Sequence, residues 1–343
     1  YAPSEVWFDN ITLMHFVSFV TLDRLSLGAY YPRRMILVTG ATGFVGRALL
    51  PRLAEMGAEV RCLIQPSKKP PRLPKGVSVQ VAISSITEFR GVRAAMSGVD
   101  TVFHLASAEW KGQRGDLEKV DVEGTRKVLE AAKEAGVSRI IYLSHLGAER
   151  ESAFEMQRVK GRIEEMIRRS EVPYTIVRSA ILFGEEDAFI NSFAMALALN
   201  PSLFLLPGDG RTLMQPLWVD DLVTCLSLIL EDPTMINQTV SLGGPEFLNL
   251  EQMMKNVMDV TTKHRAMFRV GLPYIRWATK VLEGTTPHPL ITARSFDHFA
   301  VNRLCELVSV TRYFGIKPSR FEQTIGYMAN KNWGEAMRQK MWG

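Results

Sequence analysis

The sequence predicts an α/β protein with a Rossmann-like, doubly wound parallel sheet and a small α-rich C-terminal lobe. Three observations lead to this prediction. A glycine-rich turn joins a short apolar run to an apolar-periodic stretch, and strand-like and helix-like segments alternate after it. Beyond about Phe183 the helical segments lengthen and strands become rarer. Alternation of this kind predicts parallel strands joined by helices that cover both faces of the sheet.

The first strand, residues 36–39, and the turn after it are the most informative part of the chain. Gly40 permits a tight turn, Gly43 permits a pyrophosphate to approach the backbone, and Gly46 lets the following helix pack against the strand. Strand, glycine turn and helix together make a phosphate-binding loop, because the free amides at the helix start face the diphosphate. The cofactor-binding residues predicted here are Gly40, Thr42, Gly43, Phe44, Val45 and Gly46.

The remaining elements follow from apolar runs of strand length and from helical spacing of apolar residues. Further strands are expected at 59–64, 78–82, 101–105, 139–144, 174–178 and 239–242. Helices are expected at 45–56, 90–96, 117–135 and 157–170.

These elements suggest a division of the chain into three parts. Residues 35–185 form the dinucleotide-binding domain, and residues 186–343 form the lobe, with a late strand near 239–242 that returns to the sheet. Residues 1–34 are interpreted as a leader outside the native fold, because Met35 stands directly at the start of the first strand.

The composition bounds the classes of function. The chain has 343 residues, 46% hydrophobic and 22% charged, with a formal net charge of +5, as suits a soluble globular protein. The positive surplus is scattered, without the basic stripe and interleaved aromatics of a nucleic-acid-binding protein. Cys62, Cys225 and Cys305 share no metal-ligand spacing, so no metal site is predicted. Isolated cysteines and the lack of a long apolar run indicate a cytoplasmic location.

Several segments resemble the extended and atypical short-chain dehydrogenase/reductase superfamily. They are the glycine motif Thr39–Gly46, the fourth-strand motif Asp100–Ala106, the fifth-strand end Tyr142–Ser144 and the sixth-strand end Arg178–Gly184. The chain is most similar to the NmrA-like group, and within it to bacterial relatives of the Rossmann-type accessory subunit of respiratory complex I, a group termed NAD-dependent epimerase/dehydratase-like. The resemblance implies that Leu105, Ala106, Ser179 and Ile181 line the cofactor.

The end of the second strand bears on which nicotinamide cofactor binds. NAD specificity usually needs a carboxylate there to hold the ribose 2′-hydroxyl, but this strand ends in Gln65. Lys68, Lys69 and Arg72 follow, and their charges could neutralise a 2′-phosphate. NADP(H) is therefore favoured over NAD(H). Ser85 stands near the place where the family carries an aspartate beside the adenine.

The family's reductases and epimerases use a Tyr-x-x-x-Lys pair on the helix after the fifth strand. Lys160 matches the lysine, but Met156 stands where the tyrosine belongs, and methionine cannot exchange a proton. Ser144 and Lys160 are the candidate catalytic residues that remain. His145 is an alternative acid or base, or a loop histidine without a catalytic task.

Two interpretations stay open at this point. The first is a non-catalytic dinucleotide-binding protein, acting as a sensor or as an accessory or assembly factor. The second is an NADP(H)-dependent oxidoreductase, epimerase or isomerase on a small or lipid-like substrate, with a non-standard proton donor.

Residues 328–343 carry Trp333, Met337, Met341 and Trp342 at helical spacing. Such a helix docks on its own domain or contacts a membrane peripherally.

Overall fold

The computed structural model describes residues 34–285 and 288–342. The expected leader, residues 1–34, therefore lies outside the described residues apart from Arg34. No helix of the described part has the length and apolar character needed to cross a bilayer.

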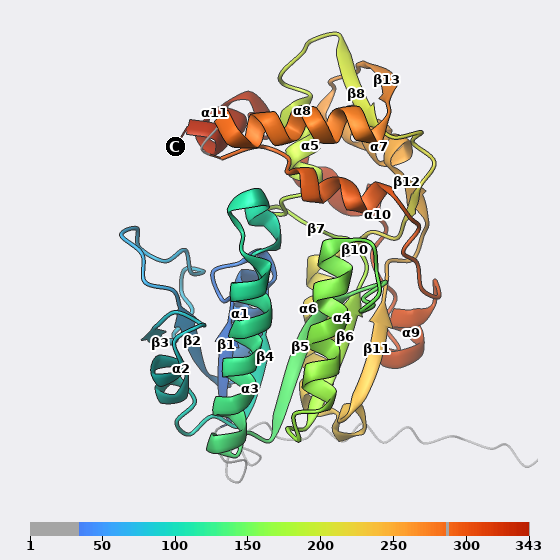
Figure 1. The fold of residues 1–343 in the computed structure, drawn as a ribbon. Coiled ribbons are helices and arrows are strands. Elements are labelled where there is room, and N and C mark those ends of the chain that lie inside the picture. The colour runs from blue at the N-terminus through green and yellow to red at the C-terminus, as the bar shows by residue number, and fades with distance from the viewer. Residues whose placement is uncertain (1–33, 286–287, 343) are drawn as a thin grey trace, which may run out of the picture. The chain divides into compact units, whose positions relative to one another are not determined.

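A seven-stranded parallel sheet forms the centre of the fold, with the order β11-β6-β5-β4-β1-β2-β3 (Figure 1). Its strands are β1 (Met35–Thr39), β2 (Glu59–Ile64), β3 (Gln80–Ile83), β4 (Thr101–His104), β5 (Arg139–His145), β6 (Tyr174–Ser179) and β11 (Gln238–Leu242). The order turns back at β1, from which the chain runs out to β3 and then returns to β4 on the other side. Ligands of doubly wound sheets bind at this switch point, outside the carboxyl ends of the strands.

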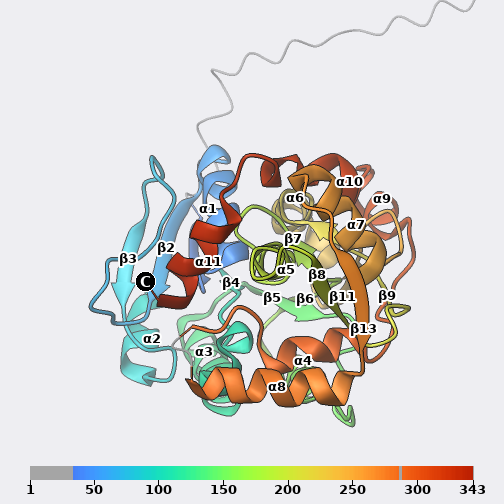
Figure 2. The same ribbon diagram turned by 90° about the horizontal axis from the view of Figure 1, so that it is seen from above.

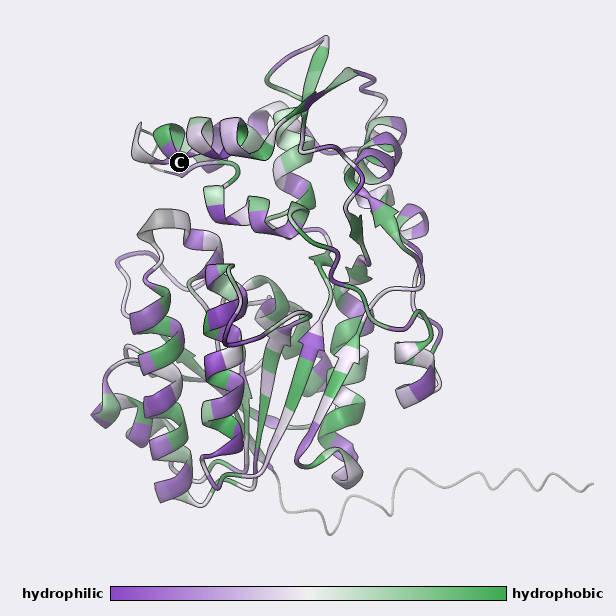
Figure 3. Ribbon diagram, turned by 45° about the vertical axis from the view of Figure 1, so that its right-hand side comes forward, coloured by the Kyte–Doolittle hydropathy of each residue, from purple (hydrophilic) through white to green (hydrophobic). Residues whose placement is uncertain are grey.

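Two helical layers cover the sheet. The helices α1 (Phe44–Glu55) and α6 (Val219–Glu231) pack over one face. The helices α2 (Phe89–Ala95), α3 (Gly124–Ala135) and α4 (Glu155–Arg168) cover the other face. Figure 3 shows hydrophobic colour along the strands and hydrophilic bands on the helices that cover them. Burial on both faces explains why the strands read as continuous apolar runs.

The predicted elements of the first half are confirmed with small shifts of their ends. The third strand lies at Gln80–Ile83, shifted toward the C-terminus from the predicted 78–82. The helix predicted over 117–135 is two elements, because a π-helical turn, Glu118–Glu123, precedes α3. This turn places the side chain of Asp121 in the interior, where its Oδ2 accepts a hydrogen bond from Ala108 N.

The C-terminal lobe has its own apolar core, separate from the two cores of the sheet. Its elements include α5 (Ile190–Ala196), α7 (Leu250–Thr261), α8 (Leu272–Thr285), α10 (Phe321–Thr324), α11 (Trp333–Trp342), the 3₁₀ segment η4 (Ala293–Phe299) and the parallel pair β8 (Leu203–Pro207) and β13 (Ala266–Val270). Figure 2 shows this lobe from above, with α8, β13 and α11 at its surface.

Two elements of residues 186–343 lie on the sheet, and one of them is the late strand that the sequence predicts there. Both α6 and the late strand β11 return to the sheet, and β11 pairs with β6. The C-terminal helix α11 docks on its own domain: Trp333 is buried, and its indole N–H donates to Met328 O. Lys340 on the same helix donates to Ser192 Oγ of α5.

Candidate functional site

The turn between β1 and α1 has the shape of a phosphate-binding loop. Gly40 adopts a φ of +75°, and a Cβ at this position would meet Ala106 N at 2.7 Å. A Cβ on Gly46 would meet Ala41 Cα at 2.7 Å, so β1 and α1 approach each other only through glycine. Gly43 is exposed, and a Cβ there would meet only Gly40 O, at 3.1 Å. Its open side lies before the first amides of α1, which carry the partial positive charge of the helix.

The other residues expected around the cofactor lie at the carboxyl ends of neighbouring strands. Leu105 and Ala106 follow β4 directly beside Gly40, and Thr42 lies within the turn. Ser179 ends β6, where its Oγ donates to Ser144 O. Ile181 follows on and lines a small cavity together with His145. The structure thus brings these residues to one edge of the sheet.

The residues expected near the adenosine lie at the ends of β2 and β3. Gln65 and Lys68 are exposed after β2. Ser85 follows β3, and its Oγ hydrogen-bonds Thr87 Oγ1 at 2.9 Å. The roles of these three residues in cofactor binding stay predictions.

The candidate catalytic residues differ in what their side chains face. Lys160 is buried, donates to Leu143 O at 3.3 Å and lies 5.0 Å over the Tyr142 ring. Ser144 is also buried, and its hydroxyl donates to Glu164 Oε1 of α4 at 2.6 Å. Met156 is buried in the same region of α4. The Ser144 hydroxyl is thus hydrogen-bonded to α4. The geometry therefore favours His145 over Ser144 as the polar group at the cleft.

His145 belongs to a buried charged cluster that sequence reasoning did not assemble. Its Nε2 lies 3.0 Å from Glu109 Oε2, and His298 Nε2 of η4 lies 3.8 Å from Glu109 Oε1. Burial by itself favours the neutral acid, but the two histidines lower the pKa of Glu109 well below its ordinary value. Trp110 stacks on His298 with the ring centroids 5.9 Å apart.

This cluster lies at the carboxyl ends of β4 and β5, the edge at which doubly wound sheets bind their ligands. One cavity beside His145 and Ile181 has a volume of about 20 Å³, and another beside Met156 and Gln157 has about 10 Å³. A water molecule needs roughly 10–15 Å³ and small-molecule sites span about 300–1,000 Å³. In this conformation these two cavities therefore have room for water but not for a substrate.

Buried polar atoms indicate that the edge of the sheet is built for a polar ligand. Among the described residues, Asp121 Oδ1, Tyr142 Oη and Gln157 Oε1 are buried and have no hydrogen-bond partner. Burial raises the pKa of Asp121, and the charge of Lys160 opposes that shift. Buried polar groups without a partner usually mark a ligand or a water. Together with the glycine turn, they fit a nicotinamide dinucleotide: the turn would hold the diphosphate, and Lys160 the nicotinamide ribose.

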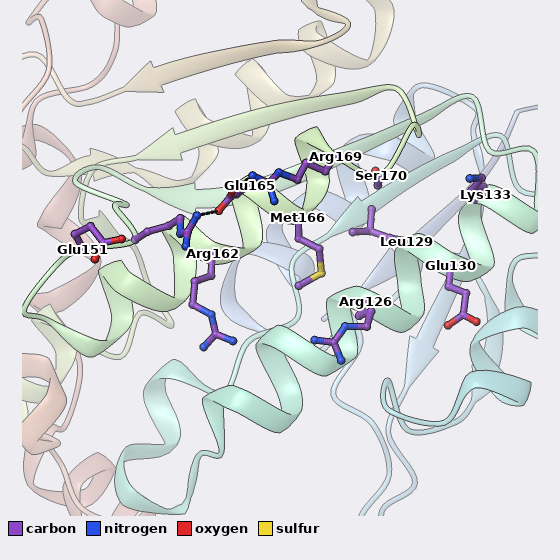
Figure 4. Close-up of a pocket in the computed structure, with 11 residues that line it drawn as sticks. Arg126, Leu129, Glu130, Lys133, Glu151, Arg162, Glu165, Met166, Arg169 and Ser170 are labelled. Atoms are coloured by element: carbon purple, nitrogen blue, oxygen red, sulfur yellow. Dashed lines mark ion pairs between the residues drawn. The ribbon is translucent and has the colours of Figure 1, made fainter.

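A larger groove on the surface is a different feature. Its volume is about 870 Å³, and it lies between α3 and α4 (Figure 4). Arg150 and Arg169 both pair with Glu165 within it, at 2.6 and 2.5 Å. None of the residues predicted to bind the cofactor lines this groove. Its many paired charges are typical of a solvated helix surface.

The residues missed by sequence reasoning are Glu109, Asp121 and His298. Glu109 lies in the segment that follows β4, beside the carboxyl end of the strand, so its place in the sequence was a usable signal. Asp121 lies in the π-helical turn, and no spacing of apolar residues in the sequence predicts such a turn. His298 comes from η4, far along the chain from His145, and only the tertiary fold brings them together.

Comparisons with known proteins agree with this geometry. Residues 40–191 match a family model described as NAD(P)H-binding. The chain is 31% identical over 245 residues to NADH dehydrogenase [ubiquinone] 1 alpha subcomplex subunit 9, mitochondrial, of Rattus norvegicus, a match that covers 69% of this chain and 63% of the relative. It is 23% identical over 303 residues to the photosystem II assembly factor Ycf39 of Guillardia theta, covering 85% of this chain and 92% of that protein.

Solved structures share the fold at lower identity. An NADPH-dependent quinone oxidoreductase of Escherichia coli, solved with NADPH, superposes with a TM-score of 0.68 at 17% identity, covering 86% of this chain and 99% of that one. The UDP-glucose 4-epimerase of Thermus thermophilus, solved with NAD, gives 0.64 at 19% identity, covering 89% and 99%. The glycine turn, the sheet order, the family match and these relatives agree. The chain carries an NAD(P)H-binding domain, and its fold and relatives match the atypical short-chain dehydrogenase/reductase superfamily.

Proposed function

We propose that this protein binds a nicotinamide dinucleotide without turning it over, and acts in the cytoplasm as an accessory or assembly factor whose partner is a protein. The observation that carries this proposal is the cleft above the nicotinamide position. A buried Met156 stands where the family has a phenol, and the neighbouring cavities measure only about 20 and 10 Å³. The names of the two relatives, a subunit of a respiratory enzyme and an assembly factor, support a role within a larger assembly.

The proposed cofactor is NADP(H). Gln65 directly follows β2 and carries no negative charge to repel a 2′-phosphate, and Lys68 and Arg72 follow in the same exposed loop. Solved relatives carry NADPH in one case and NAD in another, so the preference rests on the side chains of this chain. Exposed cations attract a phosphate weakly and are screened by salt, so the preference should shrink as ionic strength rises.

The second candidate function is an oxidoreductase in which His145 supplies the proton. The observation that favours it is the contact of His145 with the buried Glu109 carboxylate, beside Ser179 and Ile181. A carboxylate in hydrogen-bond contact fixes the tautomer and orientation of an imidazole, which a general acid or base requires. This function also requires η4 to move, because His298 and Arg303 occupy the space for a substrate.

One set of experiments separates the two functions. Calorimetric titration of the purified protein should show tighter binding of NADPH than of NADH at low ionic strength. Cofactor oxidation with quinones, aldehydes, ketones and nucleotide sugars should then stay at the background rate. Turnover that His145→Asn abolishes, while NADPH still binds, would establish the oxidoreductase and refute the non-catalytic function. Equal affinities for the two cofactors would refute the NADP(H) preference alone.

A further inference from the structure

The C-terminal lobe contains an apolar cavity that takes no part in the site at the sheet edge. Its volume is about 420 Å³, within the range of roughly 300–1,000 Å³ that small-molecule sites span. Its walls come from α5, β8, α8 and α11 and include Phe193, Phe204, Ile275 and Met341. Among the described residues that line it, only Asn200 and Thr279 are polar. The cavity therefore suits an aliphatic ligand.

The opening of this cavity is continuous with an exposed apolar surface. Three leucines that line the cavity, Leu199, Leu205 and Leu282, are themselves exposed. On α8, Tyr274 is 76% and Trp277 71% exposed, and Val281 follows at the same helical face. Exposed apolar residues gathered around a pocket indicate an interaction site, since soluble proteins seldom expose large contiguous apolar patches.

The parallel pair β8 and β13 extends this apolar surface. Phe268 of β13 pairs with Leu205 of β8, and both side chains are exposed, so they share one face of the pair. We call this surface, from Leu205 and Phe268 to Tyr274, Trp277 and Val281, the α8 face. Figures 1 and 2 both show α8 and β13 at the outer surface of the lobe.

The α8 face carries positive charge around its apolar residues. Lys280 is exposed on α8 and has no ion pair with any described residue. Arg265 donates to Asn200 O at 2.9 Å, and this carbonyl belongs to a cavity-lining residue. The one acidic residue of α8, Glu283, is buried and accepts a hydrogen bond from Ala293 N. The surroundings of the cavity are therefore cationic.

We propose that the α8 face docks on an anionic lipid bilayer and that the cavity behind it takes one acyl chain of a bilayer lipid. Tryptophan and tyrosine suit the boundary between headgroups and hydrocarbon, because each has an apolar body and a polar atom. Lys280 and Arg265 would meet the phosphates of the headgroups. A second copy of the chain fits less well, because pairing two α8 faces would bring these cations together without an acidic partner.

This surface differs from the one that the sequence suggests. The sequence left two alternatives for the C-terminal helix, docking on its own domain or a peripheral membrane contact. In the structure α11 buries Trp333 and directs Lys340 to α5 and Leu290. Met341 of the same helix lines the cavity. The helix α11 thus builds the wall of the lipid site, and α8 supplies the surface.

Vesicle sedimentation with the full chain tests the docking. We expect the protein to sediment with vesicles of phosphatidylcholine mixed with phosphatidylglycerol, to bind phosphatidylcholine vesicles much less, and to dissociate as salt increases. Trp277→Glu should lower the partition coefficient at least about tenfold, since it places a negative charge within the apolar face. The matched control is Ile83→Glu on the edge strand β3, where the side chain is also 71% exposed and binding should not change.

Lipid retention tests the cavity. Native mass spectrometry of protein recovered from vesicles should show one phospholipid per chain, and Ala196→Phe, which fills the cavity, should lose it while vesicle binding persists. Circular dichroism checks the fold, and Leu282→Glu at the opening replaces Ala196→Phe if that variant unfolds.

Several results would overturn the proposal. For the docking, these are wild-type protein that does not bind anionic vesicles, or Trp277→Glu that binds them as well as Ile83→Glu does. For the cavity, these are vesicle-bound wild-type protein that retains no phospholipid, or cavity variants that retain as much phospholipid as the wild type. A dimer that Trp277→Glu dissociates would identify a second copy as the occupant instead. Binding of free palmitate without vesicle binding would identify a soluble fatty acid. NADPH affinity should be the same in Trp277→Glu, Ala196→Phe and Leu282→Glu as in the wild type, so the test is independent of the proposed function.

Discussion

At the scale of the residue, the glycine turn contains two kinds of glycine. Gly40 and Gly46 are needed by the fold, because a Cβ at either position would overlap neighbouring backbone atoms. Gly43 is different: it has φ −76° and ψ 174°, which any residue adopts, and its added Cβ would meet only Gly40 O at 3.1 Å. A side chain at Gly43 would thus disturb the space before α1 more than the fold itself.

This distinction predicts the behaviour of Gly43→Val. The variant should keep its fold, with a stability within about 1 kcal/mol of wild type. Its affinity for NADPH should fall at least about a hundredfold, because the new side chain occupies the approach of the diphosphate to the helix amides. Isothermal titration calorimetry measures the loss, and Ala54→Val, exposed on the same helix, serves as the control. Undiminished affinity in a folded variant would contradict the placement of the diphosphate.

Single residues also show how far the candidate site could be predicted. The positions of the glycine turn and of Met156 in the site could be predicted, because a local motif fixes their spacing in the sequence. The orientation of Ser144 was not, because successive side chains of a strand point to opposite faces and a shift of one residue exchanges Ser144 and His145. The contact partners of His145 could not be predicted from the sequence, for a further reason. Glu109 and His298 come from separate segments that only the tertiary fold joins.

At the scale of the element, α4 is tied to the sheet by one buried carboxylate. Glu164 accepts hydrogen bonds from Ser144 Oγ of β5, from Arg178 of β6 and from Arg168 of its own helix. Burial opposes ionisation, but Arg178 and Ser144 lower the pKa of Glu164. The same contacts hold the helix that carries Met156 and Lys160 against the carboxyl end of β5.

Glu164→Gln should therefore destabilise the protein at pH 7. The expected loss is about 2–3 kcal/mol, less than the ~3–5 kcal/mol of a fully buried pair, because Arg168 is 38% exposed. A depressed folded pKa contributes stability above the unfolded value of about 4.3, and that stability disappears as pH falls through the folded pKa. Urea unfolding of both proteins should show the difference shrink between pH 7 and pH 3. A difference that does not change with pH would show that Glu164 is not held ionised.

The elements of the sheet were more predictable than those of the lobe. Each strand of the first half is a buried apolar run bounded by turn residues. Its hydrophobic pattern and its length can therefore be recognised from the local sequence. The strand predicted at 78–82 was misplaced because Val77, Val79 and Val81 alternate beyond the segment that pairs with β2. The pairing of β8 with β13 was not predicted. These strands lie far apart in sequence, and parallel pairing of distant segments leaves no local signal.

At the scale of the whole molecule, one charged cluster joins the two halves of the described chain. Glu109 follows β4, His145 ends β5, and His298 comes from η4 of the lobe. Arg303 donates to His298 Nδ1 at 3.3 Å and to Asp297 O at 2.8 Å. Acceptance by Nδ1 requires the neutral imidazole, so protonation of His298 would break its contact with Arg303. Access to the cleft is thereby linked to the charge of one histidine.

This linkage predicts that the cleft loosens as pH falls. Burial lowers the pKa of His298 against the opposing effect of Glu109. A base with a lowered folded pKa binds fewer protons folded than unfolded, so stability falls as pH drops through the unfolded value of about 6.5. Hydrogen exchange of residues 293–299, corrected for intrinsic rates, should therefore accelerate between pH 7.5 and pH 5.5. Each unit of pKa difference corresponds to about tenfold in the opening equilibrium at most.

Two variants show whether His298 is the titrating group. His298→Asn should remove the pH dependence of exchange in residues 293–299, because asparagine does not titrate in this range. His264→Asn is the control, since His264 is an exposed histidine of the same lobe whose nearest acid is the exposed Asp259. Loss of the pH dependence in the control, or its persistence in His298→Asn, would assign the response to another group. If His264→Asn keeps the pH dependence of exchange and His298→Asn loses it, His298 is the group that holds the lobe over the nicotinamide site at neutral pH.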